Sequence, residues 1–117
     1  MGDAGRGAPV PASHGLSAGQ VGVIREVLMP FAGRIGMVGL FGSRATGAWR
    51  PESDIDLVLY GPLSGADLDR IRTLFMESSL PMPVDVCLYE QVRGMPLGAH
   101  VDRVMRPLFR GEMLAAA

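Results

Sequence analysis

Two apolar runs joined by a short polar crossover occupy residues 40–60, and this segment constrains the fold more than any other. The first run ends at Gly42-Ser43, and the second carries Asp54 and Asp56 at alternate positions. Alternate residues of a β-strand project from the same face of a sheet, with Cα atoms roughly 6.5 Å apart. The segment therefore predicts a strand, a turn of the size that receives a phosphate group, and a second strand whose two carboxylates form a platform for a cation.

Apolar spacing and capping residues predict three longer helices around these strands. Ser17 and Gln20 have the pattern of a capping box, and the helix that they open is expected to close near residue 33. A second helix is expected from Ser64 to about residue 80. A third begins near Leu97 and ends before Pro107, because proline cannot occupy a helix interior.

Short runs of β-forming residues predict strands at 35–41, 55–60 and 84–88. A one-turn helix is expected directly after Gly42, with backbone N–H groups directed at an anion. Residues 108–114 are expected to be irregular or to form a short edge strand. These elements indicate an α/β fold of the mixed α+β type, in which a small mixed sheet packs against helices.

The 117 residues suit one domain, expected over residues 17–114. Residues 1–16 are rich in Gly, Ala, Pro and Ser without a hydrophobic period, so they are expected to form a flexible tail. Residues 115–117 are expected to form a short C-terminal tail. Hydrophobic residues make up 48% of this small chain, which indicates apolar surface for a partner, either a second copy or another protein.

Several functional classes are excluded or disfavoured by composition. All 11 basic residues are arginine, so neither a Walker A lysine nor a Schiff-base lysine is available. The net charge of −1 without a basic run does not suggest a nucleic-acid partner. Cys87 is the single cysteine, and no apolar stretch is long enough to cross a membrane, so we expect a cytoplasmic protein without a membrane partner.

Asp85 is an acid within an apolar strand segment, Val84–Leu88. A carboxylate in such surroundings is costly to ionise unless it has a partner, so Asp85 is expected to join Asp54 and Asp56 in one cluster. Clustered carboxylates repel one another, and Mg²⁺, which prefers oxygen ligands, would relieve that repulsion. The alternative is that all three are ordinary surface or strand-edge acids, which their occurrence together after Gly42-Ser43 disfavours.

Three short motifs occur in order: GSRATG, then SDIDL, then VDV. Together they resemble the nucleotidyltransferase superfamily that includes DNA polymerase beta, and in particular the minimal nucleotidyltransferases. The resemblance covers roughly residues 17–110 and implies a polymerase-beta-like nucleotidyltransferase fold. Thr46 stands where an arginine is usual in the first motif.

Carried over by motif position, the resemblance implies a role for each site residue. Gly42 and Ser43 would hold the nucleotide phosphates, with Arg44 as a further nucleotide-binding contact. Asp54 and Asp56 would bind metal, and Asp85 would complete this catalytic and metal-binding set by helping to activate the acceptor hydroxyl. Two Mg²⁺ ions and ATP as substrate are implied.

Several minimal nucleotidyltransferases are antitoxins that transfer AMP from ATP to a tyrosine of a HEPN ribonuclease toxin. The resemblance therefore implies an adenylyltransferase that neutralises a cognate HEPN toxin. Two alternatives stay open: a binding protein that masks its toxin without catalysis, and a transferase acting on a small hydroxylated molecule such as an aminoglycoside. Thr46 favours the first alternative, and the absence of an appended substrate domain disfavours the second.

Two further side chains and one motif leave choices open. Trp49 could stack on a nucleotide base or pack on the sheet, and His100 is expected at the surface or an interface. The G-x-S-x-G pattern around Ser17 matches a hydrolase nucleophile elbow, but no strand precedes it. A helix N-cap is the expected role of Ser17.

Overall fold

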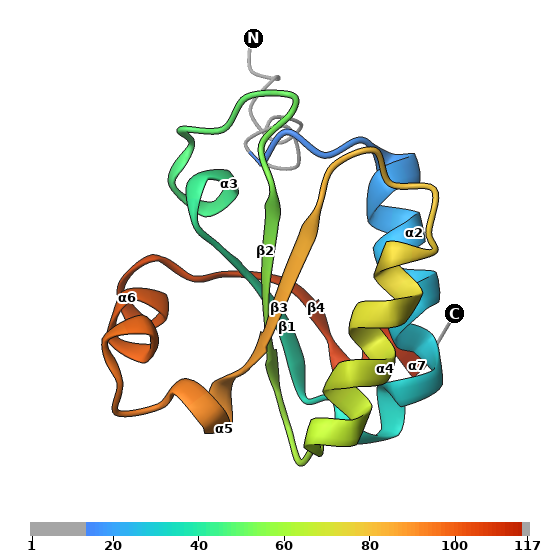
Figure 1. The fold of residues 1–117 in the computed structure, drawn as a ribbon, viewed down its shortest axis with the longest axis vertical. Helices are drawn as coiled ribbons and strands as arrows, with labels where there is room; N and C mark the ends of the chain where they lie inside the picture. Colours follow the sequence, from blue (N-terminus) through green and yellow to red (C-terminus); the bar gives the residue numbers. More distant parts are fainter. Residues whose placement is uncertain (1–13, 116–117) are drawn as a thin grey trace, which may run out of the picture.

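A computed structural model describes residues 14–115, which build one four-stranded sheet flanked by helices (Figure 1). The strands lie in the order β3-β2-β1-β4. The elements in chain order are α2 (Ala18–Leu28), the 3₁₀ helix η2 (Met29–Arg34), β1 (Met37–Phe41), α3 (Ser43–Thr46), β2 (Ile55–Tyr60), α4 (Gly65–Met76), β3 (Val84–Leu88), α5 (Tyr89–Val92), α6 (Pro96–Val104), β4 (Arg106–Arg110) and α7 (Gly111–Ala115).

The two long helices begin at the predicted caps. The Gln20 amide donates to the Ser17 hydroxyl at 3.1 Å, while the Ser17 amide donates to the Gln20 side chain at 3.0 Å. Ser64 and Asp67 form the equivalent pair at the start of α4. Each box satisfies two helix N–H groups that would otherwise lack partners.

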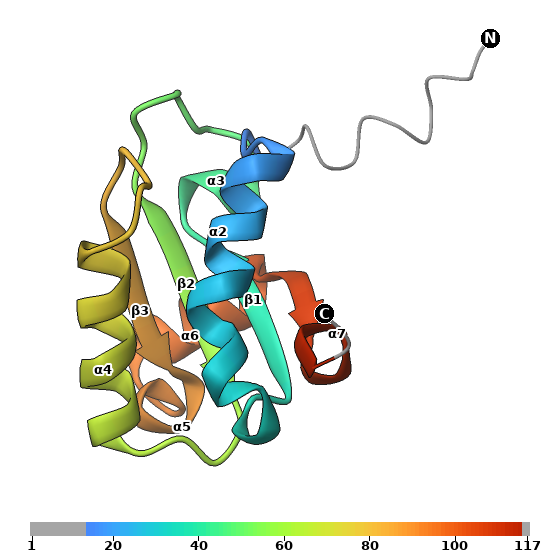
Figure 2. The same cartoon turned by 90° about the vertical axis from the view of Figure 1, so that its right-hand side faces the viewer.

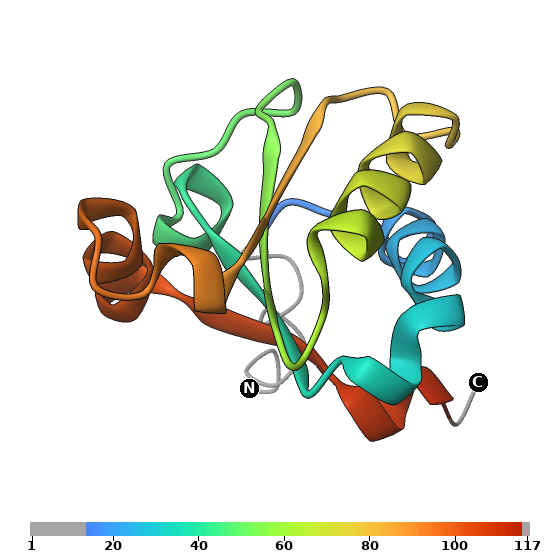
Figure 3. The same cartoon turned by 60° about the horizontal axis from the view of Figure 1, so that its bottom comes forward.

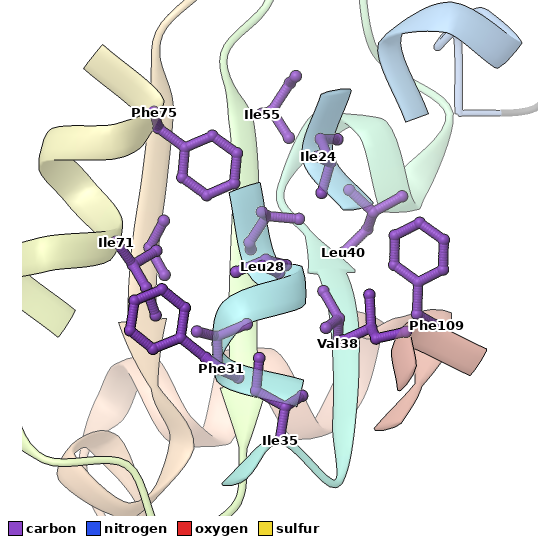
Figure 4. Packing of buried hydrophobic residues seen from close by; sticks show 14 of the residues in the cluster. Ile24, Leu28, Phe31, Ile35, Val38, Leu40, Ile55, Ile71, Phe75 and Phe109 are labelled. Atoms are coloured by element: carbon purple, nitrogen blue, oxygen red, sulfur yellow. The ribbon is translucent and has the colours of Figure 1, made fainter. Parts of the chain in front are cut away.

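Helices α2 and α4 cover one face of the sheet and enclose the main hydrophobic core (Figures 2 and 4). Ile24 and Leu28 from α2 and Ile71 from α4 have no exposed surface. They meet alternate strand residues such as Leu57 of β2. The period of the strand thus decides which residues enter this core and which face the other way.

The opposite face of the sheet is covered only in part. Helices α5 and α6 lie on that side (Figure 3), where a small cluster forms around Phe41, Val58 and Val101. The alternate positions Asp56 and Asp85 share this face, beyond the end of the cluster. Because α5 and α6 cover this face only in part, Asp56 is half-buried and Asp85 is exposed, and both lie next to the small apolar cluster.

Two differences from the expected ends of the chain have local causes. Residues 14–16 belong to the packed body rather than to a tail, because Leu16 is buried in the main core. The rest of the expected tail, residues 1–13, and residues 116–117 lie outside the described residues. Ala115, expected in the C-terminal tail, closes helix α7.

The segment after α6 is more regular than expected. Helix α6 ends at Val104, before Pro107, as predicted. Residues 108–114 were expected to be irregular or to form a short edge strand; the observed edge strand is β4, which begins earlier, at Arg106. Proline is tolerated there because an edge strand has N–H groups that need no partner strand. Residues 111–115 form α7, and the turn α5 was not predicted.

None of the helices within residues 14–115 is long and apolar enough to cross a membrane.

Candidate functional site

The turn after β1 is built on a glycine conformation. Gly42 has φ +71° and ψ −155°, a region that L side chains rarely adopt. Its carbonyl accepts from the amides of Ala45 at 3.1 Å and Thr46 at 3.2 Å, which closes the single turn α3. The amides of Ser43 and Arg44 begin this turn, where a helix has N–H groups without helical partners. Gly42 and Ser43 therefore form the turn between β1 and α3, at the C-terminal end of β1.

Asp56 and Asp85 are brought together by the sheet. Strand β2 pairs with β3 in parallel, and Asp56 is the register partner of Asp85. On the other side Asp56 is the partner of Phe41, the residue before Gly42. The C-terminal end of β1 and the N-terminal ends of β2 and β3 thus meet at one end of the sheet, the upper end in Figure 1. Asp54 is exposed and lies just ahead of β2.

The Asp56 carboxyl has an unusual affinity for its proton. The pKa of Asp56 is raised from 3.8 to about 6, mainly by burial and then by the negative charges of Asp85 and Asp54, while the His100 charge acts in the opposite direction. Both neighbouring acids are therefore close enough for Asp56 to experience their charge. The ionised carboxylates repel one another, and a bound cation would relieve this repulsion.

This shift predicts a pH dependence of folding stability. The unfolded chain loses the Asp56 proton near pH 3.8 and the folded chain near pH 6, so the folded state binds more protons in between. The free energy of unfolding should therefore fall as pH rises from about 4 to about 6, and this contribution should be level above that. Urea unfolding in metal-free buffer across this range measures it. Equal slopes for the natural chain and Asp56→Asn would contradict it.

The acids do not form a complete metal cage. Within residues 14–115, no three His, Cys, Asp or Glu side chains are arranged so that they could hold a metal ion. The expected cluster of Asp54, Asp56 and Asp85 is thus an electrostatic group rather than a preformed three-ligand centre. Because Mg²⁺ usually takes one or two carboxylates together with substrate phosphates, this donor set still fits Mg²⁺ with a bound nucleotide.

Arg44 lies elsewhere than expected. Its side chain has no exposed surface, and its guanidinium donates to backbone carbonyls, including those of Ser53 at 3.0 Å and His14 at 3.0 Å. The Arg44 guanidinium lies over the Trp49 ring, with Cζ 5.7 Å from the ring centroid. This geometry favours a structural role for Arg44 over the nucleotide contact implied by the motif. Thr46 is exposed, with its hydroxyl 3.4 Å from the Ser43 carbonyl.

A pocket of about 320 Å³ opens beside the acid pair. Its lining residues are Phe41, Asp56, Arg72, Asp85, Val86, Cys87 and Leu97. It includes two side chains that sequence reasoning missed. Arg72 comes from α4, donates to the Val86 carbonyl of edge strand β3 at 3.1 Å and so reaches the pocket, while the exposed Leu97 comes from α6.

His100 lies closer to the acids than expected. It is half-buried on α6, with its ring edge against Phe41 at 6.4 Å between centroids, and its charge acts on Asp56. His100, Arg72 and Leu97 belong to no recognisable sequence motif. They reach the site only because α4 and α6 pack onto the sheet.

Known proteins show which family and fold this chain shares. The family model described as "Nucleotidyltransferase domain" matches residues 23–105. A search of curated proteins found no match. Solved structures with a similar fold include a toxin-antitoxin complex with AMP-PNP, at 20% identity and a TM-score of 0.62, with 82% of this chain and 81% of that chain covered.

Two further structures are similar. One is a mutant of the toxin-antitoxin complex MntA–HpeT in which two aspartates are replaced by glutamates, at 18% identity and a TM-score of 0.59, covering 82% of this chain and 81% of that chain. The other is a nucleotidyltransferase-type protein from Sulfolobus solfataricus, at 20% identity and a TM-score of 0.53, covering 94% of this chain and 95% of that chain. The fold class expected from the sequence is confirmed, and the chain belongs to the nucleotidyltransferase domain family.

Proposed function

We propose that this protein transfers AMP from ATP to a tyrosine hydroxyl of a partner protein, a HEPN-type toxin that it neutralises. The observation that carries the proposal is the juxtaposition of Asp56 with Asp85 across β2 and β3, directly beside the Gly42-Ser43 turn. A phosphate-sized turn next to paired carboxylates suits phosphoryl chemistry on a metal-bound nucleotide.

Each group has a defined part in the proposed reaction. Gly42 and Ser43 hold the triphosphate through backbone amides and the Ser43 hydroxyl. Asp85 accepts the proton of the acceptor hydroxyl while that oxygen bonds to the α-phosphorus. The bond from the α-phosphorus to the bridging oxygen breaks, and pyrophosphate leaves with its electron pair.

Asp54, Asp56 and Asp85 are the residues that would hold Mg²⁺. Carboxylate oxygens are its preferred ligands, and the raised pKa of Asp56 reflects negative charge that a cation would balance. Two bound Mg²⁺ ions would supply charge stabilisation at the attacking and the leaving oxygen. In the MntA–HpeT mutant the replaced aspartates are two positions apart, the spacing of Asp54 and Asp56.

The pocket beside the acids favours an aromatic acceptor. Phe41, Val86 and Leu97 give it apolar walls, and Arg72 adds a positive charge. A phenol ring fits apolar walls with its hydroxyl toward Asp85.

Transfer of radioactive label tests the proposal. With Mg²⁺ and a candidate toxin, α-labelled ATP should label the toxin on tyrosine and γ-labelled ATP should not, because the γ-phosphate leaves in pyrophosphate. Mass spectrometry of the toxin should show added AMP. Label from γ-labelled ATP would indicate a kinase instead, and absence of any label with an intact, neutralised toxin would favour the masking alternative.

A further inference from the structure

Arg44 is the only charged side chain that is fully buried among the residues that the structure describes. Burying a charge is costly unless hydrogen bonds or an opposite charge compensate it. Here the compensation comes from carbonyl dipoles: both ion pairs found among residues 14–115 involve other arginines, Arg34 and Arg93. Such a residue needs an explanation beyond ordinary core packing.

The guanidinium contacts two separate segments of chain. Nε and Nη2 donate to the Ser53 carbonyl at 3.3 and 3.0 Å, and Nη2 also lies 3.3 Å from the carbonyls of Arg50 and Pro51. On its other side Nη1 donates to the His14 carbonyl at 3.0 Å. One side chain thus holds the crossover loop ahead of β2 and the segment ahead of α2.

The sequence positions of these contacts connect them to the site. Arg44 directly follows Ser43 of the phosphate turn, and Ser53 directly precedes Asp54. We propose that Arg44 is a positioning residue that sets the place of Asp54 relative to the Gly42-Ser43 turn. The inference rests on the proposed function, since it assumes that the turn and Asp54 act on one nucleotide.

Besides Arg44, Trp49 holds the loop, because its half-buried ring packs against Gly15 and the Arg44 guanidinium. Positions 46–48 and 50–52 are exposed, so no apolar side chain there anchors it to the core. Ser53 closes the loop locally, because its amide donates to the Arg50 carbonyl at 2.9 Å and its hydroxyl accepts from the Arg50 amide at 2.8 Å. Arg44 attaches this closed turn to α3.

The residue type follows from the geometry. Arginine presents five N–H groups in a planar fork, which can reach several carbonyls at once, and its flat face can lie beside Trp49. Lysine has one nitrogen on a flexible stem and cannot bridge the His14 and Ser53 carbonyls in the same way. Arg44→Lys therefore keeps the charge and removes the bridge.

Two variants test the inference at 10 °C, where the proteins are kept folded. Arg44→Lys removes the bridge, and Ser53→Ala loosens the same loop without disturbing the buried charge. Each should speed hydrogen exchange of the backbone amides of residues 50 and 52–54 in nucleotide-free protein. Each should also lower kcat, by up to about 100-fold for Arg44→Lys, because a displacement near 1 Å has that effect on a reacting geometry. The Mg²⁺ concentration for half-maximal rate should rise, with a smaller change in KM for ATP.

Arg25→Lys is the matched control. Arg25 donates to the Met113 carbonyl at 2.7 Å, so it is also an arginine on a backbone carbonyl, but it joins α2 to α7. It should leave loop exchange and the Mg²⁺ dependence unchanged. Loss of activity in Arg44→Lys with unchanged loop exchange would overturn the inference in favour of a direct nucleotide contact, as would unchanged exchange and kinetics. Exchange is measured without ATP, so a natural chain that transfers no label would refute the proposed function separately.

Discussion

Asp56→Asn is expected to lower nucleotidyl transfer by about 10³-fold while the protein stays folded. The metal and the paired acids would supply several kcal/mol of charge stabilisation to the transition state, and each 1.36 kcal/mol corresponds to tenfold in rate. Asparagine keeps the shape of Asp56 but removes the charge that would attract Mg²⁺. Initial rates of label transfer from α-labelled ATP at saturating Mg²⁺ measure the effect.

The same substitution should not weaken the fold at pH 7. The pKa of Asp56 is raised by burial and by Asp85 and Asp54, so the ionised carboxylate is less favourable in the folded chain than in the unfolded one. Removing its charge is therefore expected to raise the melting temperature slightly in metal-free buffer. Asp69→Asn, an exposed acid on α4, is the control and should change neither rate nor stability.

Growth of cells that express the toxin separates catalysis from masking. If Asp56→Asn at equal expression fails to restore growth, neutralisation requires the reaction. If it restores growth as well as the natural chain does, the protein neutralises by binding, and the proposed transfer is not its role in the cell. Binding of the toxin by the variant should be measured alongside, since it is expected to persist.

Gly42→Ala is expected to abolish transfer and to destabilise the fold by about 1–3 kcal/mol. Gly42 has φ +71°, where any side chain is strained. An added Cβ would also collide with the Asp56 carboxylate oxygen, so the turn or Asp56 must move. The phosphate turn and the acid strand are thus packed so closely that no methyl group fits between Gly42 and Asp56. Urea unfolding and label transfer measure both effects.

Gly22→Ala is the matched control for this prediction. Gly22 lies within helix α2, and a Cβ there would meet nothing within 4 Å. Because alanine favours helix by about 0.8–1 kcal/mol over glycine, this substitution should stabilise the protein and leave transfer unchanged. A Gly42→Ala variant that retained normal stability and rate would show that the turn tolerates a side chain, contrary to the geometry.

Much of the site could be predicted from local patterns because strand periodicity is local information. The spacing of Asp54 and Asp56, the Gly42-Ser43 turn after an apolar run and the two capping boxes each depend on residues within a few positions of one another. Such patterns determine which way a side chain points within its own element. They predicted strands β1, β2 and β3, both long helices and the end of α6 before Pro107.

The sequence by itself could not determine contacts between distant segments. The pairing of Asp56 with Asp85 depends on the parallel register of β2 and β3. Helix α4 connects these two strands, and the packing of the core determines their register. The position of Arg72 near the acids likewise depends on how α4 packs at the edge of β3.

Arg44 shows the difference most clearly. Its motif position suggested a nucleotide contact, and only the tertiary structure placed the carbonyls of His14 and Ser53 around its guanidinium. The local sequence pattern determines to which side of its own helix or strand a side chain points. Its hydrogen-bond partners depend instead on which distant segments the fold brings close to it. The sequence therefore determined the chemistry available at this site, and tertiary packing decided which groups face one another there.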